Sequence, residues 1–102
     1  MPSELIQADY DQLEEIAIRF RYQADDIFAL LQRLRQLVHD LQAEGWMGLG
    51  SQAFYTEMEY VVLPAVQKLA ESLDDAGMMV HQIQELFELA EEAASHTIQT
   101  GQ

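Results

Sequence analysis

Apolar residues recur at every seventh position along the first half of the chain. This row consists of Leu13, Phe20, Ile27, Leu34 and Leu41. A second row is interleaved with it at Ala17, Ala24, Leu31 and Val38. The two rows together have the period of a helix face and not that of a strand, which alternates every second residue. They predict one long amphipathic helix.

The apolar face of this first helix is wider than a two-stranded coil requires. Ile16, Leu30 and Leu37 lie beside the heptad rows. A broad face of this kind is typical of a helix that packs on two neighbours in a bundle. We therefore expect the first helix to contact more than one partner.

The ends of the first helix are indicated by capping residues. The carboxylate of Asp9 can accept hydrogen bonds from free amides, with Gln12 placed to return the contact, and Gly45 suits a left-handed C-terminal cap. The helix should therefore run from about residue 9 to 43. Residues 44–50 contain three glycines, which predicts the tight turn there.

A second amphipathic helix is predicted from about residue 51 to 94. Ser51 can cap its start, and Pro64 should kink or break it, with Leu63 displaced from helical angles, because proline lacks an amide hydrogen and crowds the preceding turn. Its apolar residues step by threes and fours: Met58, Val62, Ala65, Leu69, Leu73, Ala76, Val80, Ile83, Phe87, Ala90 and Ala94.

These elements predict an all-α fold, an antiparallel two-helix hairpin forming a single domain over residues 1–94, with a frayed polar tail at 95–102. Two long helices contact each other along only one line, so the rest of each apolar face remains exposed to water. We expect dimerisation into a four-helix bundle. The core and dimer seam is assigned to Leu13, Phe20, Ile27, Leu34, Leu41, Val62, Leu69, Leu73, Val80 and Ile83.

The net charge of the chain limits the kinds of partner that it can bind. Acidic residues outnumber basic ones 18 to 5, which gives a net charge of -13. Such a chain repels phosphate backbones and anionic lipid heads. The first fifteen residues lack a basic segment followed by an apolar one, and no apolar run approaches the about 18 residues that span a bilayer. We expect no nucleic-acid partner, no ordinary signal peptide and no membrane-spanning segment.

Catalytic chemistry is not predicted. Di-metal helical bundles use Glu-x-x-His, but Gln36, Met78 and Ala93 stand three residues before the three histidines. In a hairpin folded near residue 47, His39 and His81 also lie far apart. We therefore expect neither an enzyme nor a metal or cofactor site.

Trp46 is the only tryptophan and lies in the glycine-rich turn. Its large ring can close one end of a bundle, or it can dock to another protein, and one half-buried ring can do both. Gly48 permits positive φ or a close backbone approach. Trp46 and Gly48 are thus the candidate turn and docking residues.

With Trp46-Met47-Gly48 at its centre, the chain resembles the WXG family, the hundred-residue early-secreted-antigen-like proteins exported by type VII secretion systems. The resemblance extends from the entry at residues 6–9, through Leu13, Ala17 and Phe20, to Ala53-Phe54 at the start of the second helix. It implies helical hairpins that pair as antiparallel homodimers or heterodimers and leave the cell folded, without a cleaved signal peptide.

The resemblance also implies a recognition signal for a membrane ATPase. In the family, Trp-x-Gly of one subunit lies near a Tyr-x-x-x-Asp/Glu segment of its partner. The corresponding residues here are Phe87 and Glu91, with phenylalanine in place of tyrosine. Phe87 also fits the period of the helix core, which is the alternative interpretation.

The leading hypothesis is a secreted substrate, or substrate-pairing partner, of a type VII system. The protein would fold in the cytoplasm first, pair with itself or a family relative, and be recognised by the secretion ATPase. The alternative is a cytosolic helical adaptor that binds a partner helix in its groove.

Overall fold

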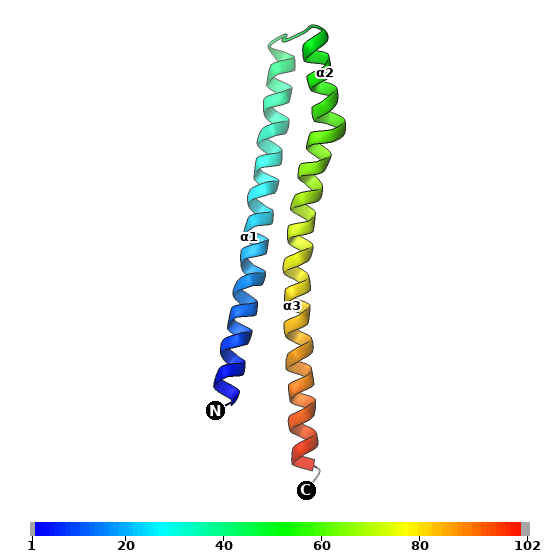
Figure 1. Ribbon diagram of the computed structural model, residues 1–102. Coiled ribbons are helices and arrows are strands. Elements are labelled where there is room, and N and C mark those ends of the chain that lie inside the picture. Colours follow the sequence, from blue (N-terminus) through cyan, green and yellow to red (C-terminus); the bar gives the residue numbers. More distant parts are fainter. Residues whose placement is uncertain (1, 101–102) are drawn as a thin grey trace.

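The structure is a computed structural model that describes residues 2–100, with side chains placed for residues 7–96. Helix α1 (Pro2–Ala43) runs antiparallel to a second rod formed by α2 (Leu49–Glu57), the π-helical turn η1 (Met58–Val62) and α3 (Leu63–Thr100) (Figure 1). No strand occurs within residues 2–100. The prediction of an all-α antiparallel hairpin is confirmed.

The hairpin is long and thin. It measures 80 × 19 × 15 Å, and its radius of gyration is 22.7 Å, where a compact domain of this length would have about 13 Å. Its accessible surface is 7939 Å², against about 5,900 Å² for a compact monomer of the same mass. An isolated hairpin therefore leaves about 2,000 Å² more surface in water than such a monomer does.

The contact line on α1 follows the heptads found in the sequence. Tyr10, Ala17, Ala24 and Leu31 are buried at intervals of seven residues. The other row, which begins at Leu13, is half-buried along its length. Burial on one line, with small residues at its centre, allows the two backbones to approach closely.

Gly77 marks the closest approach on the opposite rod. A β-carbon at this position would lie 2.9 Å from the backbone oxygen of Ala17 and 3.3 Å from the β-carbon of Phe20. Ala70, one heptad earlier, is completely buried. Small residues on both helices therefore set the spacing of the hairpin.

The interruption expected at Pro64 takes the form of the π-helical turn η1. The amide of Leu63 donates to the carbonyl of Met58, five residues back. This wider turn makes room for the ring of Pro64, which would crowd the carbonyl of Tyr60 in a regular α-helix. The expectation that Leu63 leaves helical angles is wrong, because its φ is -62° and its ψ is -43°.

The π-helical turn also shifts the apolar stripe that faces α1. One extra residue in a turn rotates everything beyond it by about 100° relative to the regular pattern. The line of α3 that faces α1 consequently moves one residue on from several of the expected positions, and it follows Leu63, Val66, Ala70, Leu73, Gly77, Val80 and Gln84; Asp74 and the expected Ala76 are also half-buried. Leu69 and Ile83 lie outside this line and are exposed, whereas Val62, Leu73 and Val80 are half-buried.

Helix α1 ends at Ala43, as expected, but the starts of both rods and the end of the second differ from the expected ones. Helix α1 begins at Pro2 instead of near Asp9, since proline suits the first helical turn, where its missing amide hydrogen has no partner to lose. Helix α2 begins at Leu49 after Gly48, and the Ser51 hydroxyl donates to the Gly48 carbonyl, 2.9 Å away, without capping an amide. Helix α3 continues to Thr100, through most of the tail expected to fray; Gly and Pro, which would stop it, are absent from 95–100.

We predict that Gly77→Ala destabilises the hairpin by about 1–3 kcal/mol, because the added methyl group meets backbone and cannot move aside. The free energy of unfolding in urea, at one fixed protein concentration, measures the effect. Gly50→Ala is the control, since nothing lies within 4 Å of its added β-carbon. Equal stability of the two variants would contradict the close approach.

Candidate functional site

The loop between the two rods is held by backbone hydrogen bonds. The amide of Trp46 donates to the Leu41 carbonyl and that of Gly45 to the Gln42 carbonyl, both at 3.1 Å. This pair of bonds forms a Schellman cap, which places Gly45 at a φ of 82°. Gly48 has a φ of 132°, in a region that favours glycine. The two glycines therefore determine the backbone path of the loop that carries Trp46.

Three aromatic rings form a cluster at this end of the hairpin, which we call the tip cluster: Trp46, Phe54 and Tyr55. The ring centroids of Trp46 lie 5.3 Å from those of Phe54 and 5.6 Å from those of Tyr55, in edge-to-face geometry. The Tyr55 hydroxyl donates to the Trp46 carbonyl over 2.9 Å, and burial raises the pKa of Tyr55. The cluster thus fixes the indole relative to α2.

The same end of the molecule presents uncharged side chains to solvent. Trp46 is 45% exposed, Met47 82% and Leu49 91%. Residues 45–56 contain no charged side chain, although the chain as a whole is 23% charged. Hollows lie on both sides of the indole, one toward Tyr55 and the other toward Phe54. Trp46 therefore packs against the hairpin and remains accessible.

A second exposed apolar surface runs along one side of both long helices. Ile16 and Leu30 each precede a buried residue of α1 by one position, Leu69 likewise precedes the buried Ala70 of α3, and Ile83 precedes the half-buried Gln84. In antiparallel helices these preceding positions come to the same side of the contact line. We call this surface the pairing face; it comprises Ile16, Leu30, Leu37, Leu69, Met79, Ile83 and Leu86.

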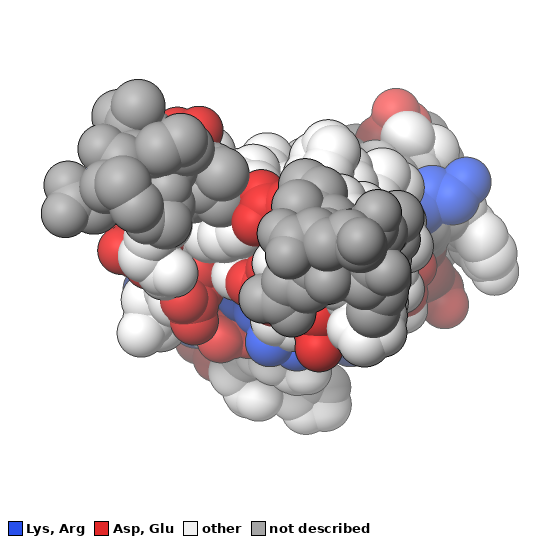
Figure 2. All heavy atoms as spheres, turned by 90° about the horizontal axis from the view of Figure 1, so that it is seen from below, with Lys and Arg blue, Asp and Glu red and all other residues white. Residues whose placement is uncertain are grey.

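The other side of the hairpin is predominantly polar. The Arg35 guanidinium donates to the Gln67 side-chain oxygen across the two helices, over 3.0 Å. His81 lies 2.8 Å from Glu85 on α3, and a hollow beside them is also lined by Glu14 and Arg21. Seen along the rod, charged side chains gather on the lower side of the helix pair, whereas uncharged ones fill most of the upper notch (Figure 2). The two sides therefore suit different partners.

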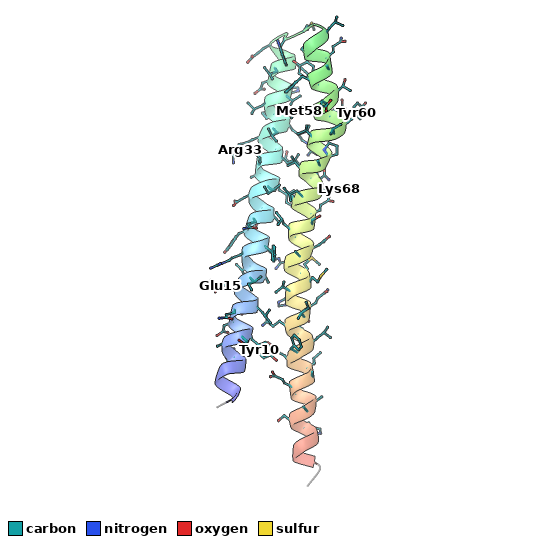
Figure 3. The ribbon with its side chains drawn as sticks, in the orientation of Figure 1. Tyr10, Glu15, Arg33, Met58, Tyr60 and Lys68 are labelled. Atoms are coloured by element: carbon teal, nitrogen blue, oxygen red, sulfur yellow. The ribbon has the colours of Figure 1, made fainter. Side chains whose placement is uncertain are left out.

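Phe87 and Glu91 line a hollow between α3 and the first turns of α1, together with Tyr10 and Leu13. Phe87 is 57% exposed, so it lies at the edge of the contact line and not within it. Tyr10 points from α1 toward α3 (Figure 3) and is buried, and its hydroxyl makes no hydrogen bond of ordinary geometry. Burial, and next the nearby Glu91 carboxylate, raise the pKa of Tyr10 to about 12.

Sequence reasoning did not single out Tyr10 as part of this site. The residue stands seven positions before Ala17 and so extends the buried row by one repeat. The signal was present, but tyrosine is a weak marker of a core because its hydroxyl also suits a surface. The structure brings Tyr10, Phe87 and Glu91 together, and it places Trp46 and Gly48 at the opposite end of the hairpin.

The described side chains include no group of three or more His, Asp or Glu residues arranged to hold a metal ion. None of the helices, over the part of the chain that the structure describes, is long and apolar enough to cross a membrane. The candidate surfaces for function are the tip cluster with its exposed neighbours, the pairing face and the hollow at Tyr10.

Comparison with known proteins agrees with this geometry. A family described as WXG100, proteins of 100 residues with WXG, matches residues 5–92. The chain belongs to the WXG100 family. The matched region contains Trp46-Met47-Gly48 and nearly all of both rods. Neither a curated protein nor a solved structure matches the chain. Family membership associates this WXG100 chain with type VII secretion and with small, non-enzymatic helical proteins that pair as dimers.

Tyr55→Phe should loosen the tip by removing the bond to the Trp46 carbonyl, at a cost of about 0.5–1.5 kcal/mol. Because Trp46 is the only tryptophan, its fluorescence reports the tip directly. We expect stronger quenching by acrylamide in this variant and no change in Tyr22→Phe, whose side chain is exposed on α1. Unchanged quenching in Tyr55→Phe would count against the role of the hydroxyl.

Tyr10 should make stability depend on alkaline pH. Its folded pKa of about 12 exceeds the unfolded value of 10.0, so its contribution is complete below pH 10 and is lost as the pH rises toward 12. Thermal unfolding between pH 9 and 12 measures the slope. We expect a shallower loss of stability in Tyr10→Phe than in the parent, and a parent-like slope in Tyr22→Phe.

Proposed function

We propose that this WXG100 protein is a folded substrate, or a substrate-pairing partner, of a type VII secretion system. It folds in the cytoplasm, pairs through its apolar side, and is recognised by the secretion ATPase before it leaves the cell. The observation that carries the proposal is the tip: a tryptophan fixed by two rings and two glycine turns, yet half-exposed among uncharged neighbours.

The pairing face supports the dimeric form of the substrate. Monomeric proteins rarely expose contiguous apolar patches larger than a few hundred Å², whereas this hairpin has an apolar stripe along both helices. Its surface exceeds that of a compact monomer by about 2,000 Å². Packing two such faces together gives the four-helix bundle and removes the stripe from water.

The tip supports recognition by a protein. Half-buried tryptophans with accessible rims are frequent anchors at protein interfaces, and the hollows beside Trp46 leave room for side chains of a partner. The absence of charge from residues 45–56 lowers the desolvation cost of docking this end. The ATPase is the proposed partner, and Phe87 with Glu91 is the proposed second part of the signal.

A cytosolic adaptor is the second candidate function, because the pairing face could also accept an amphipathic helix of another protein. The two functions differ in where the protein is found. Retention of the whole population inside a cell with an active type VII system would favour the adaptor.

Replacing exposed tip residues should reduce export without loss of fold. Met47→Ser and Leu49→Ser remove apolar groups whose side chains are almost entirely exposed, so each should change stability by less than about 0.5 kcal/mol. We expect the combined variant to reach the culture medium at least several-fold less than the parent, measured as the secreted fraction. Trp46→Ala should reduce it further.

Circular dichroism and sedimentation must show parent-like helicity and association for these variants. Tyr22→Ser, which removes an exposed aromatic ring far from the tip, is the matched control. Parent-level export of the Met47/Leu49 variant and of a still-folded Trp46→Ala would refute recognition at the tip.

A further inference from the structure

The basic residues of the chain are absent from the end of the hairpin that lies opposite the tip. All five of them stand between positions 19 and 68. We call residues 9–18 and 82–95 the open end, and its charged side chains are all acidic: Asp9, Asp11, Glu14, Glu15, Glu85, Glu88, Glu91 and Glu92. Seen from this end, acidic side chains appear beside both helices (Figure 2). Carboxylates that gather without counter-charges attract cationic partners.

The hollow at Tyr10 belongs to this acidic end. Its volume is about 380 Å³. Besides Tyr10, its lining includes two carboxylates and three apolar side chains: Asp9, Glu91, Leu13, Ile16 and Phe87. Phe87 is 57% exposed, so its ring is accessible. A long basic side chain suits such a lining, because its methylene stem covers apolar surface while its charged head meets carboxylates.

Polar atoms buried next to the hollow lack hydrogen-bond partners. Tyr10 is 8% exposed, and its hydroxyl has no partner of ordinary geometry among the described side chains. Gly77 lies against Ala17, and seven residues further along each helix Gln84 comes level with Tyr10. The Gln84 side-chain oxygen is also buried without a partner, although its amide donates to Glu88 over 3.2 Å. Because buried polar atoms are normally paired, this place lacks donors.

From these features we infer that the hollow at Tyr10 binds one basic side chain of a protein partner, an arginine in preference to a lysine. A guanidinium carries five N–H donors in a planar fork, so it can donate to the Glu91 carboxylate and to the Tyr10 hydroxyl oxygen together, whereas an ammonium is a point charge. Its positive charge lies beside the ring of Phe87. The inference deepens the proposed function, on which it rests for the identity of the partner.

Other kinds of ligand suit the hollow less well. An acidic or phosphorylated ligand is repelled by the net charge of -13. A purely apolar ligand would cover carboxylates without pairing them, which costs free energy. A metal ion requires several ligands, and the side chains that the structure describes include no group of three suitable residues. A basic side chain is the ligand whose charge and stem both match the lining.

The site is made from both helices. Tyr10 and Leu13 come from α1, whereas Phe87 and Glu91 come from α3. Tyr10 points across toward α3 (Figure 3). The complete lining therefore exists only when the hairpin is folded, so a partner that inserts a basic side chain here distinguishes the folded protein from an unfolded chain.

Binding of a defined peptide tests the inference. The probe is acetyl-Gly-Ser-Arg-Ser-Gly-amide, and the matched peptide carries citrulline, which keeps the shape of arginine and loses its charge. Each peptide is titrated into ¹⁵N-labelled full-length protein at pH 7 and 50 mM salt, and the amide chemical shifts are followed. We expect the arginine peptide to shift amides of residues 9–16 and 84–91, with a dissociation constant on the order of 1 mM. The citrulline peptide should bind at least about tenfold more weakly.

Substitutions locate the contact within the hollow. Glu91→Gln removes the charge at nearly constant size and should raise the dissociation constant at least about fivefold. Tyr10→Phe removes only the hydroxyl and should raise it about threefold. Glu92→Gln is the matched control, because it makes the same charge change at an exposed neighbour outside the lining, and it should stay within about twofold of the parent. Circular dichroism must show parent-like helicity in all three variants.

Equal binding of the two peptides, equal effects of the Glu91 and Glu92 substitutions, or shifts confined to the tip would each overturn the inference. The proposed function is measured separately, by export of the tip variants, and it would stand if these variants lost export while the peptide failed to bind. Arginine-dependent binding at the hollow together with parent-level export of the tip variants would instead remove the function and keep the site.

Discussion

Two helices that touch along a single line can cover only one strip of each other. In this hairpin the strip is set by small residues, with Ala17 and Ala24 on α1 facing Ala70 and Gly77 on α3, and their size lets the backbones approach closely. Larger apolar side chains fit the contact toward its ends, at Tyr10 and Leu31, but not at this close approach, and many of those left outside lie on one flank of it. The pairing face is therefore a direct consequence of how tightly the hairpin itself is packed.

Much of the fold could be predicted from the sequence because α1 carries one unambiguous heptad pattern and the turn is rich in glycine. The all-α hairpin follows from these two features, and so does the half-buried row from Leu13 to Leu41. The start of α1 could not be predicted in the same way. Asp9 is a good capping residue, but nothing before it prevents a helix, and Pro2 is itself compatible with a first turn.

Helix α3 was harder to interpret because it carries two apolar stripes. One contains Leu69 and Ile83, and the other contains Ala70 and Gly77. Hydrophobicity favours the first, since glycine and alanine contribute little apolar area, whereas close packing against α1 requires the second. The sequence thus indicated which residues avoid water without indicating which of them meet inside the same chain. For the candidate site, the position of Trp46 was evident from the sequence, but the Tyr10 hollow needed the two helices to be placed together.

The π-helical turn η1 decides between these two stripes. If residues 58–62 formed a regular α-helical turn with no residue removed, everything after Pro64 would turn back by a little more than a quarter of a revolution about the rod, and Leu69 and Ile83 would swing toward α1. The large side chains that now face solvent would then be buried, and Ala70 and Gly77 would be exposed. The one extra residue held in this wide turn thus decides which stripe faces inward. Tightening the turn to a regular α-helix without removing a residue would exchange the inner and outer surfaces of the second rod beyond Pro64 while leaving its helix content almost intact.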